Sequence, residues 1–174
     1  MSDTAPTPAL EAPPPGKLAA LAILAIVIVL IIAWVVIATK FIADTSLVGG
    51  FMLLWYWATV EKLETARLPA ALIGAVVGIA LAWFLVWGAA TYGAAGLGGA
   101  LGLLLLTLYL DILKAVPLAI NAATTLFLTL AAAPLVQLHV NWGELVLSTV
   151  AGGLFFGAVA EGMKRLAGRF AAAG

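Results

Sequence analysis

Polar residues recur on one face of an otherwise apolar segment, residues 114–130, which reads KAVPLAINAATTLFLTL. Asn121, Thr124, Thr125 and Thr129 lie three or four positions apart, and residues at that spacing share a face of an α-helix. Amide and hydroxyl groups donate and accept hydrogen bonds without a fixed charge. This face predicts one of two roles: hydrogen bonds that hold helices together, or a passage for a small polar solute.

Pro117 stands just before this face, and proline is well tolerated in the first turn of a helix, where its missing N–H costs least. Under the passage hypothesis, the N–H groups of residues 118–121 point, with the positive end of the helix dipole, into a cavity lined by Asn121 and the threonines. Under the alternative, the same side chains bond to neighbouring helices, at about 0.6 kcal/mol each.

A second polar group follows in "NWGELVLST", where Glu144 and Ser148 lie one helical turn apart. Glu144 comes two residues after Trp142, so we expect it at the outer membrane interface and near a helix N-terminus, where the dipole favours a carboxylate. An ionisable group at membrane depth, the alternative, would be costly and functional. The turn before it holds Gln137 and His139, and His139 is either a solvated loop residue or a pH-sensitive gate.

Catalytic and cofactor chemistry is not predicted. The chain has no cysteine and one histidine, which leaves neither a thiolate nor a set of metal ligands. No serine–histidine–aspartate set or phosphate-binding glycine loop is present, so we expect no enzyme activity, no metal and no cofactor. A formal net charge of zero gives no basic surface for nucleic acid.

The composition requires that lipid surrounds the elements that position these residues. Of the 174 residues, 65% are hydrophobic and 9% are charged, against roughly 45–50% and about 25% in soluble domains. A bilayer span needs about 20 apolar residues, and the charged residues divide the chain into such runs. The sequence predicts about six transmembrane helices, the second short or re-entrant. They are Lys17 to Lys40, Ser46 to Val60, Leu68 to Ala90, the run from the "TYGAAG" turn to Leu110, Pro117 to about Leu135, and Trp142 to Ala160.

The predicted fold class is an all-α, polytopic membrane helix bundle with both termini in the cytoplasm. Seven of the eight Lys and Arg residues fall on the side of the N-terminus in this topology, and basic residues accumulate on the cytoplasmic side. Residues 1–16 are rich in proline and are expected to be a disordered cytoplasmic tail. Residues 17–170 are expected to form a single transmembrane domain.

Glycines at four-residue spacing predict where the helices approach each other, because small residues allow close contact between helices in lipid. The first run has no such groove and is expected to face lipid. The alternative for the glycines is that they border a narrow pore or mark a helix break. The predicted packing glycines are Gly74, Gly78, Gly98, Gly102, Gly153 and Gly157.

The order of these features resembles a bacterial inner-membrane family catalogued as domain of unknown function 1097. The resemblance covers most of the chain from about Ser46 and is clearest in "VPLAINAATTLF" and "NWGELVLSTVAGGLFFGAV". It implies an inner-membrane location and carries over no functional residue. "AVPLAINAATTLFL" is also similar to the half-helix segments of urea transporters, which implies passage of a small neutral solute.

The leading functional hypothesis is therefore a channel or transporter of the bacterial inner membrane. A small polar or neutral solute would pass along Asn121, Thr124, Thr125, Thr129, Ser148 and Glu144, in a homo-oligomer that uses the glycine faces. The alternative is a non-transporting membrane subunit or scaffold whose polar residues only bind helices together. Direct hydrogen bonds from Asn121 to a neighbouring helix favour the scaffold, and a water-accessible cavity at Asn121 and Thr125 favours transport.

Overall fold

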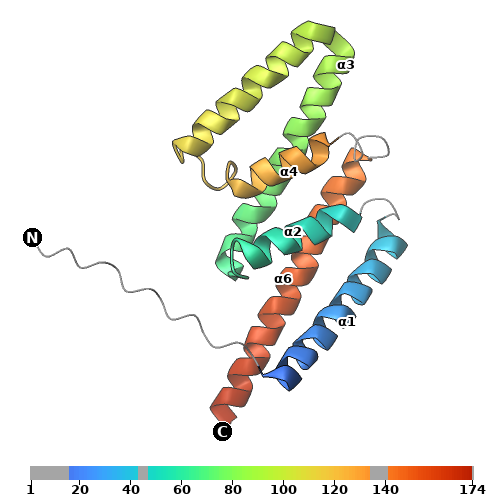
Figure 1. Cartoon of the computed structure of the whole chain (residues 1–174), viewed down its shortest axis with the longest axis vertical. Coiled ribbons are helices and arrows are strands. Elements are labelled where there is room, and N and C mark those ends of the chain that lie inside the picture. Colours follow the sequence, from blue (N-terminus) through green and yellow to red (C-terminus); the bar gives the residue numbers. More distant parts are fainter. Residues whose placement is uncertain (1–15, 43–46, 134–140, 174) are drawn as a thin grey trace, which may run out of the picture. The chain divides into compact units, whose positions relative to one another are not determined.

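The computed structural model describes residues 16–42, 47–133 and 141–173, with side chains to residue 169. In these ranges all regular structure is helical, which confirms the predicted all-α class (Figure 1). The predicted tail before Gly16, together with Gln137 and His139, lies outside the described residues. The elements are α1 Lys17–Phe41, α2 Leu47–Thr59, a short 3-10 turn Thr65–Arg67, α3 Leu68–Ile112, α4 Ala122–Ala132 and α6 Trp142–Ala173.

Three described helices are long and apolar enough to cross a membrane: α1, α3 with its preceding 3-10 turn, and α6. The prediction of six spans is therefore wrong. The second and fifth predicted runs contain helices of only 13 and 11 residues, α2 and α4. At 1.5 Å per residue these reach about 20 and 17 Å, well short of the roughly 30 Å hydrocarbon core.

The third and fourth predicted runs are two arms of α3, which folds back at Gly93 (Figure 1). Gly93 adopts φ 58° and ψ −133° inside the predicted "TYGAAG" turn, a conformation that glycine reaches without a steric penalty. Beyond the turn the arms meet at Gly88 and Gly96, where a Cβ on Gly96 would collide with the Gly88 carbonyl oxygen. The arms, residues 68–92 and 94–112, are thus in direct backbone contact.

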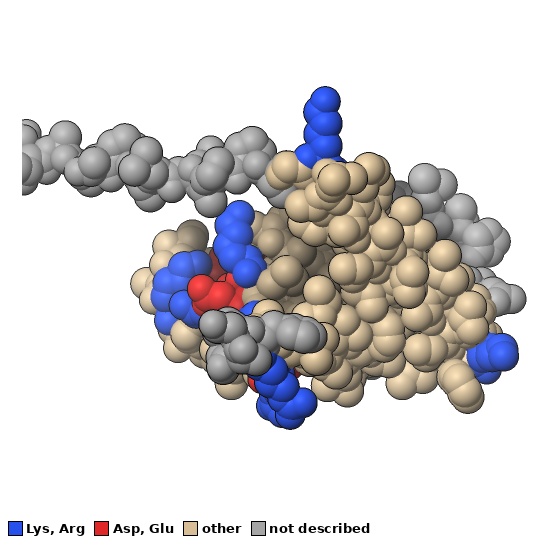
Figure 2. Space-filling model, turned by 90° about the horizontal axis from the view of Figure 1, so that it is seen from below, with Lys and Arg blue, Asp and Glu red and all other residues tan. Residues whose placement is uncertain are grey.

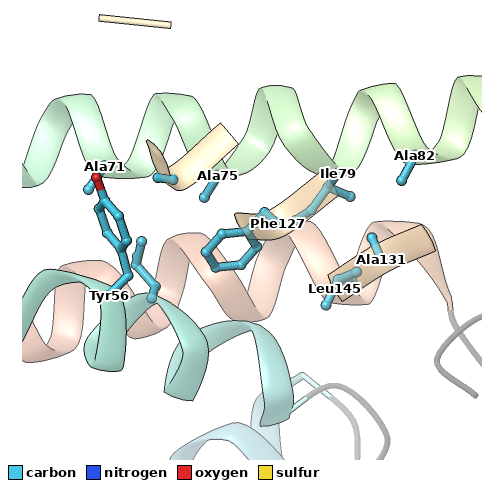
Figure 3. Packing of buried hydrophobic residues seen from close by; sticks show 10 residues of the cluster. Tyr56, Ala71, Ala75, Ile79, Ala82, Phe127, Ala131 and Leu145 are labelled. Carbon is cyan, nitrogen blue, oxygen red and sulfur yellow. The ribbon is translucent and has the colours of Figure 1, made fainter. Parts of the chain in front are cut away.

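The short helices pack on the long ones, α4 against α3 and α2 against α6. A buried cluster joins these four helices, with Phe127 of α4 facing the small side chains of α3 (Figure 3). Alanine at the contact lets the α3 and α4 backbones approach, and the large ring fills the remaining space. The cluster consists of Leu53, Tyr56, Ala71, Ala75, Ile79, Ala82, Ala123, Phe127, Ala131 and Leu145.

The described residues divide into two compact units after Ala33. Residues 18–33 of α1 are apolar, and all of them except Leu30 and Ala33 are exposed. From Trp34 onward α1 belongs to the same unit as the other helices, and the fully buried Trp34 ring packs 5.8 Å from the rings of Phe155 and Phe156.

Trp34 occupies a slot that two glycines leave open. A Cβ on Gly50 of α2 would lie 2.6 Å from the Trp34 ring, and a Cβ on Gly152 of α6 would lie 2.5 Å from the Gly50 Cα. Real side chains do not tolerate such distances, so the slot exists because both positions lack a side chain. The indole is rigid and has Phe155 and Phe156 beside it, so it cannot yield easily.

Gly50→Ala is expected to lower the free energy of unfolding in detergent by about 1–3 kcal/mol, because overpacking a filled core forces side chains from their rotamers. Thermal unfolding followed by circular dichroism measures the effect. The matched control is Gly162→Ala in α6, where nothing lies within 4 Å of the new Cβ. If the two variants were equally stable, the claim that the Trp34 ring needs the space left by Gly50 would be wrong.

Candidate functional site

Asn121 caps the N-terminus of α4. Its backbone is extended (φ −154°, ψ −175°), its Oδ1 accepts from the Ala123 N–H at 3.0 Å, and its own N–H donates to Thr124 Oγ1 at 3.1 Å. This reciprocal arrangement is a capping box, which satisfies backbone donors that the first turn leaves unpaired. The helix in the fifth predicted run, α4, therefore begins at Ala122 and not at Pro117 as predicted from the sequence.

The same side chain joins α4 to α3. Asn121 Nδ2 donates to the Ala70 carbonyl oxygen of α3 at 3.0 Å and to the Pro117 carbonyl oxygen at 3.1 Å. The amide lies against Gly74, where any Cβ would collide with it. Asn121 is half-buried, and its donors and acceptor are engaged in bonds within the chain.

The three threonines of the predicted stripe divide between two environments. Thr124 is 1% exposed, and its Oγ1 donates to the Ala119 carbonyl oxygen at 2.9 Å. Thr125 and Thr129 are exposed, and Thr129 Oγ1 donates back to the Thr125 carbonyl oxygen at 2.8 Å. The structure therefore brings Thr124 together with Asn121 and places Thr125 and Thr129 on the outer surface of α4.

Ser148 of α6 is fully buried and faces α2. Its Oγ accepts from the Gly50 N–H at 3.3 Å, so a side chain of α6 bonds to the backbone of α2. Thr149 beside it bonds to the Leu145 carbonyl oxygen at 2.7 Å, and its Oγ1 occupies the position that a Cβ on Gly49 would take. This contact was not predicted from the sequence, in which the glycine pair of α2, Gly49 and Gly50, was the available signal.

Glu144 lies in the first turn of α6, half-buried, in a second capping arrangement. Asn141 Oδ1 accepts from the N–H groups of Gly143 at 3.1 Å and Glu144 at 3.4 Å, while Asn141 Nδ2 donates to Glu144 Oε1 at 2.9 Å. A carboxylate in this position is stabilised by the helix dipole. The geometry matches the capping role and places Glu144 apart from the Asn121 contacts.

The predicted packing glycines also divide into two groups. Gly74 and Gly78 contact α4, where a Cβ on Gly78 would collide with the Thr124 carbonyl oxygen. Gly153 receives the side chains of Leu53 and Leu72, and Gly157 receives that of Leu68. Gly98 and Gly102, on the second arm of α3, have nothing within 4 Å of a built Cβ.

The described residues offer few groups that could bind a metal ion or a polar ligand. In the described part of the chain, no three His, Cys, Asp or Glu residues lie close enough to hold a metal ion. A depression on α1 is lined by aliphatic side chains only, those of Ala25, Ile26, Val29 and Leu30.

Comparison with known proteins finds no matching family model, no matching curated protein and no matching solved structure. The resemblance to domain of unknown function 1097 stays a prediction. The fold and the polar contacts define a class, that of all-α proteins with several candidate membrane spans, here three among the described residues.

Asn121→Ala is expected to lower the free energy of unfolding by about 1–2 kcal/mol, since it removes both a helix cap and an interhelical hydrogen bond. Chemical unfolding in mild detergent measures the loss. Thr125→Ala, which alters an exposed neighbour, should stay within about 0.5 kcal/mol of wild type. If both variants were as stable as wild type, the contact with Ala70 would have no role in holding α4 to α3.

Proposed function

We propose that the chain is a multi-pass protein of the bacterial inner membrane that acts as a non-transporting subunit or scaffold. The observation that carries this proposal is the hydrogen bond from Asn121 Nδ2 to the Ala70 carbonyl oxygen. The residue best suited to bind a polar solute instead joins two helices of the same chain.

The other residues of the predicted pathway support the same proposal. The hydroxyl groups of Thr124 and Ser148 bond to backbone groups within the chain, and Glu144 accepts a hydrogen bond from Asn141, the cap residue of α6. Thr125 and Thr129 face outward. A solute pathway needs polar groups that converge on one space, whereas these groups serve the α3–α4 contact, the α2–α6 contact, a helix end and the outer surface.

Orientation follows from the basic residues. Lys164 Nζ donates to the Leu63 carbonyl oxygen at 3.0 Å, which brings the turn after α2 and the C-terminal part of α6 to one end of the molecule. Because Lys and Arg accumulate on the cytoplasmic side, we place this end in the cytoplasm. The position of the N-terminus stays a prediction.

The second arm of α3 is the surface for assembly in this proposal. Gly74 and Gly78 on the first arm are covered by α4, whereas Gly98 and Gly102 have the same spacing and no neighbour within 4 Å. Close helix association in lipid uses such small-residue faces. We assign this face to a second copy of the chain, so that the scaffold is a homo-oligomer.

Proteoliposomes containing the wild-type protein are expected to take up urea and glycerol at the rate of protein-free vesicles, because the polar groups are already hydrogen-bonded. Stopped-flow light scattering measures this, with vesicles that hold a known solute channel as the positive control. Flux above background that disappears in a folded Asn121→Leu variant would instead establish transport.

The variant Gly98→Leu with Gly102→Leu is expected to convert an oligomer into the 17.8 kDa monomer, because leucine prevents close approach of the second arm. Light scattering after size exclusion in detergent, and cross-linking in the native membrane, report the change. Gly162→Leu is the matched control, also at a glycine with nothing within 4 Å. A wild-type protein that is monomeric in both measurements would exclude this face as an assembly surface.

A further inference from the structure

One end of the described structure carries most of its basic side chains, and we call this the basic end. It combines the turn after α2 with the C-terminal part of α6, which Lys164 joins. Figure 2 shows Lys and Arg atoms gathered around a small group of acidic atoms on the face seen from below. The basic end contains Lys62, Arg67, Lys164, Arg165 and Arg169, with the carboxylates of Glu61, Glu64 and Glu161.

The turn in the basic end has a defined shape. Lys62 and Leu63 adopt positive φ, 51° and 59°, and this lets the Leu63 N–H reach the Trp57 carbonyl oxygen at 3.0 Å. The Trp57 indole N–H then donates to the Glu64 carbonyl oxygen at 2.8 Å. Two hydrogen bonds with Trp57, one from Leu63 and one to Glu64, therefore hold the turn, and the Lys62 side chain is exposed.

Each carboxylate of the basic end has a hydrogen-bond or ion-pair partner within the chain. Glu61 accepts from the buried Tyr56 hydroxyl at 2.9 Å, and burial, with the Glu61 carboxylate, raises the pKa of Tyr56 to about 12, so the phenol remains a donor. Glu161 accepts from Arg165 Nε at 2.9 Å. Glu64 faces Arg67 at 3.8 Å.

Several cationic donors remain after these contacts. Lys62 and Arg169 have no hydrogen bond or ion pair within the described ranges. Lys164 uses two of its three N–H groups, on Leu63 and on Thr65 Oγ1 at 3.3 Å. Arg165 keeps the terminal nitrogens of its guanidinium, because only Nε binds Glu161. The basic end thus offers several cationic donors that no group among the described residues uses.

The length of α6 sets the depth of these donors. Its 32 residues extend about 48 Å, against a hydrocarbon core of roughly 30 Å. After Glu144 the next charged residue in α6 is Glu161, so residues from 161 onward emerge at the level of the lipid headgroups. Met163 and Leu166 are 48% and 56% exposed on the face opposite Lys164 and Arg165, an amphipathic pattern typical of a helix at the membrane interface.

We propose that the basic end binds the phosphate of an anionic phospholipid in the cytoplasmic leaflet. Phosphate is the anion present at this depth, and clustered Lys and Arg beside a membrane-spanning helix recognise acidic lipids. Arginine suits phosphate because its planar group gives paired hydrogen bonds. This inference depends on the membrane placement in the proposed function but not on the scaffold role.

Native mass spectrometry of the protein in neutral detergent tests the site, with phosphatidylglycerol or phosphatidylcholine of identical acyl chains added. The wild-type protein should retain phosphatidylglycerol in preference to phosphatidylcholine. Lys62→Gln with Arg169→Gln should weaken phosphatidylglycerol binding by roughly thirtyfold and leave phosphatidylcholine binding unchanged. Both side chains are exposed and make no hydrogen bond or ion pair with other described residues, so the fold should persist, which circular dichroism checks. The charge-preserving Lys62→Arg with Arg169→Lys should bind as wild type does.

Three results would overturn the proposal. Wild type could show no preference between the two lipids. The control Lys17→Gln with Lys40→Gln, which removes the exposed lysines at the ends of α1, could weaken binding as much as the double variant at the basic end. Inorganic phosphate could displace the lipid at equal concentration, which would make the site one for a free anion. Resistance of the protein to carbonate extraction from membranes tests the membrane placement separately.

Discussion

The close approach of α4 to the first arm of α3 is the contact on which the rest of the arrangement depends. α4 is too short to cross a bilayer, and a short helix in apolar surroundings leaves backbone N–H groups that need partners. Asn121 meets this need at the first turn, and it also bonds to α3 where Gly74 leaves room for the amide. One side chain thereby caps a helix and docks it. Phe127 and the α3 alanines then pack because the two backbones are already close.

Much of the fold followed from the sequence because long apolar runs form helices wherever their own backbone bonds can be completed. This logic predicted α1, the start of α6 at Trp142 and the turn at Gly93 correctly, although α6 continues to Ala173, beyond the predicted end at Ala160. It failed for residues 117–121, which are mostly apolar yet not helical. Hydropathy records preference for lipid but not which residue will cap a helix. The carbonyl partner of Asn121, Ala70, lies 51 positions away, beyond what any local pattern reports.

The polar site shows the same limit at the level of single side chains. Helical spacing grouped Asn121 with three threonines, but this assumes that Asn121 is inside the helix. As the cap, Asn121 lies in extended backbone, and only Thr124 turns towards it. The pair Asn121 and Thr124, a cap residue followed three positions later by a hydroxyl, was a readable signal for a helix start. The partner of Ser148 on α2 had only an indirect signal, the pair Gly49 and Gly50, because its donor is a backbone N–H, which every residue except proline carries.

The packing of the two arms of α3 depends on the number of residues in the turn at Gly93 as much as on the identity of a core residue. Gly88 and Gly96 meet because a fixed number of residues separates them across Gly93. A single added residue in this turn would rotate the second arm by about 100° about its own axis. Such a rotation would turn Ala100 and Thr107, now buried, away from their present contacts and bring other residues of the arm into that position. Insertions and deletions here would therefore change which side of the helix is buried without altering its composition.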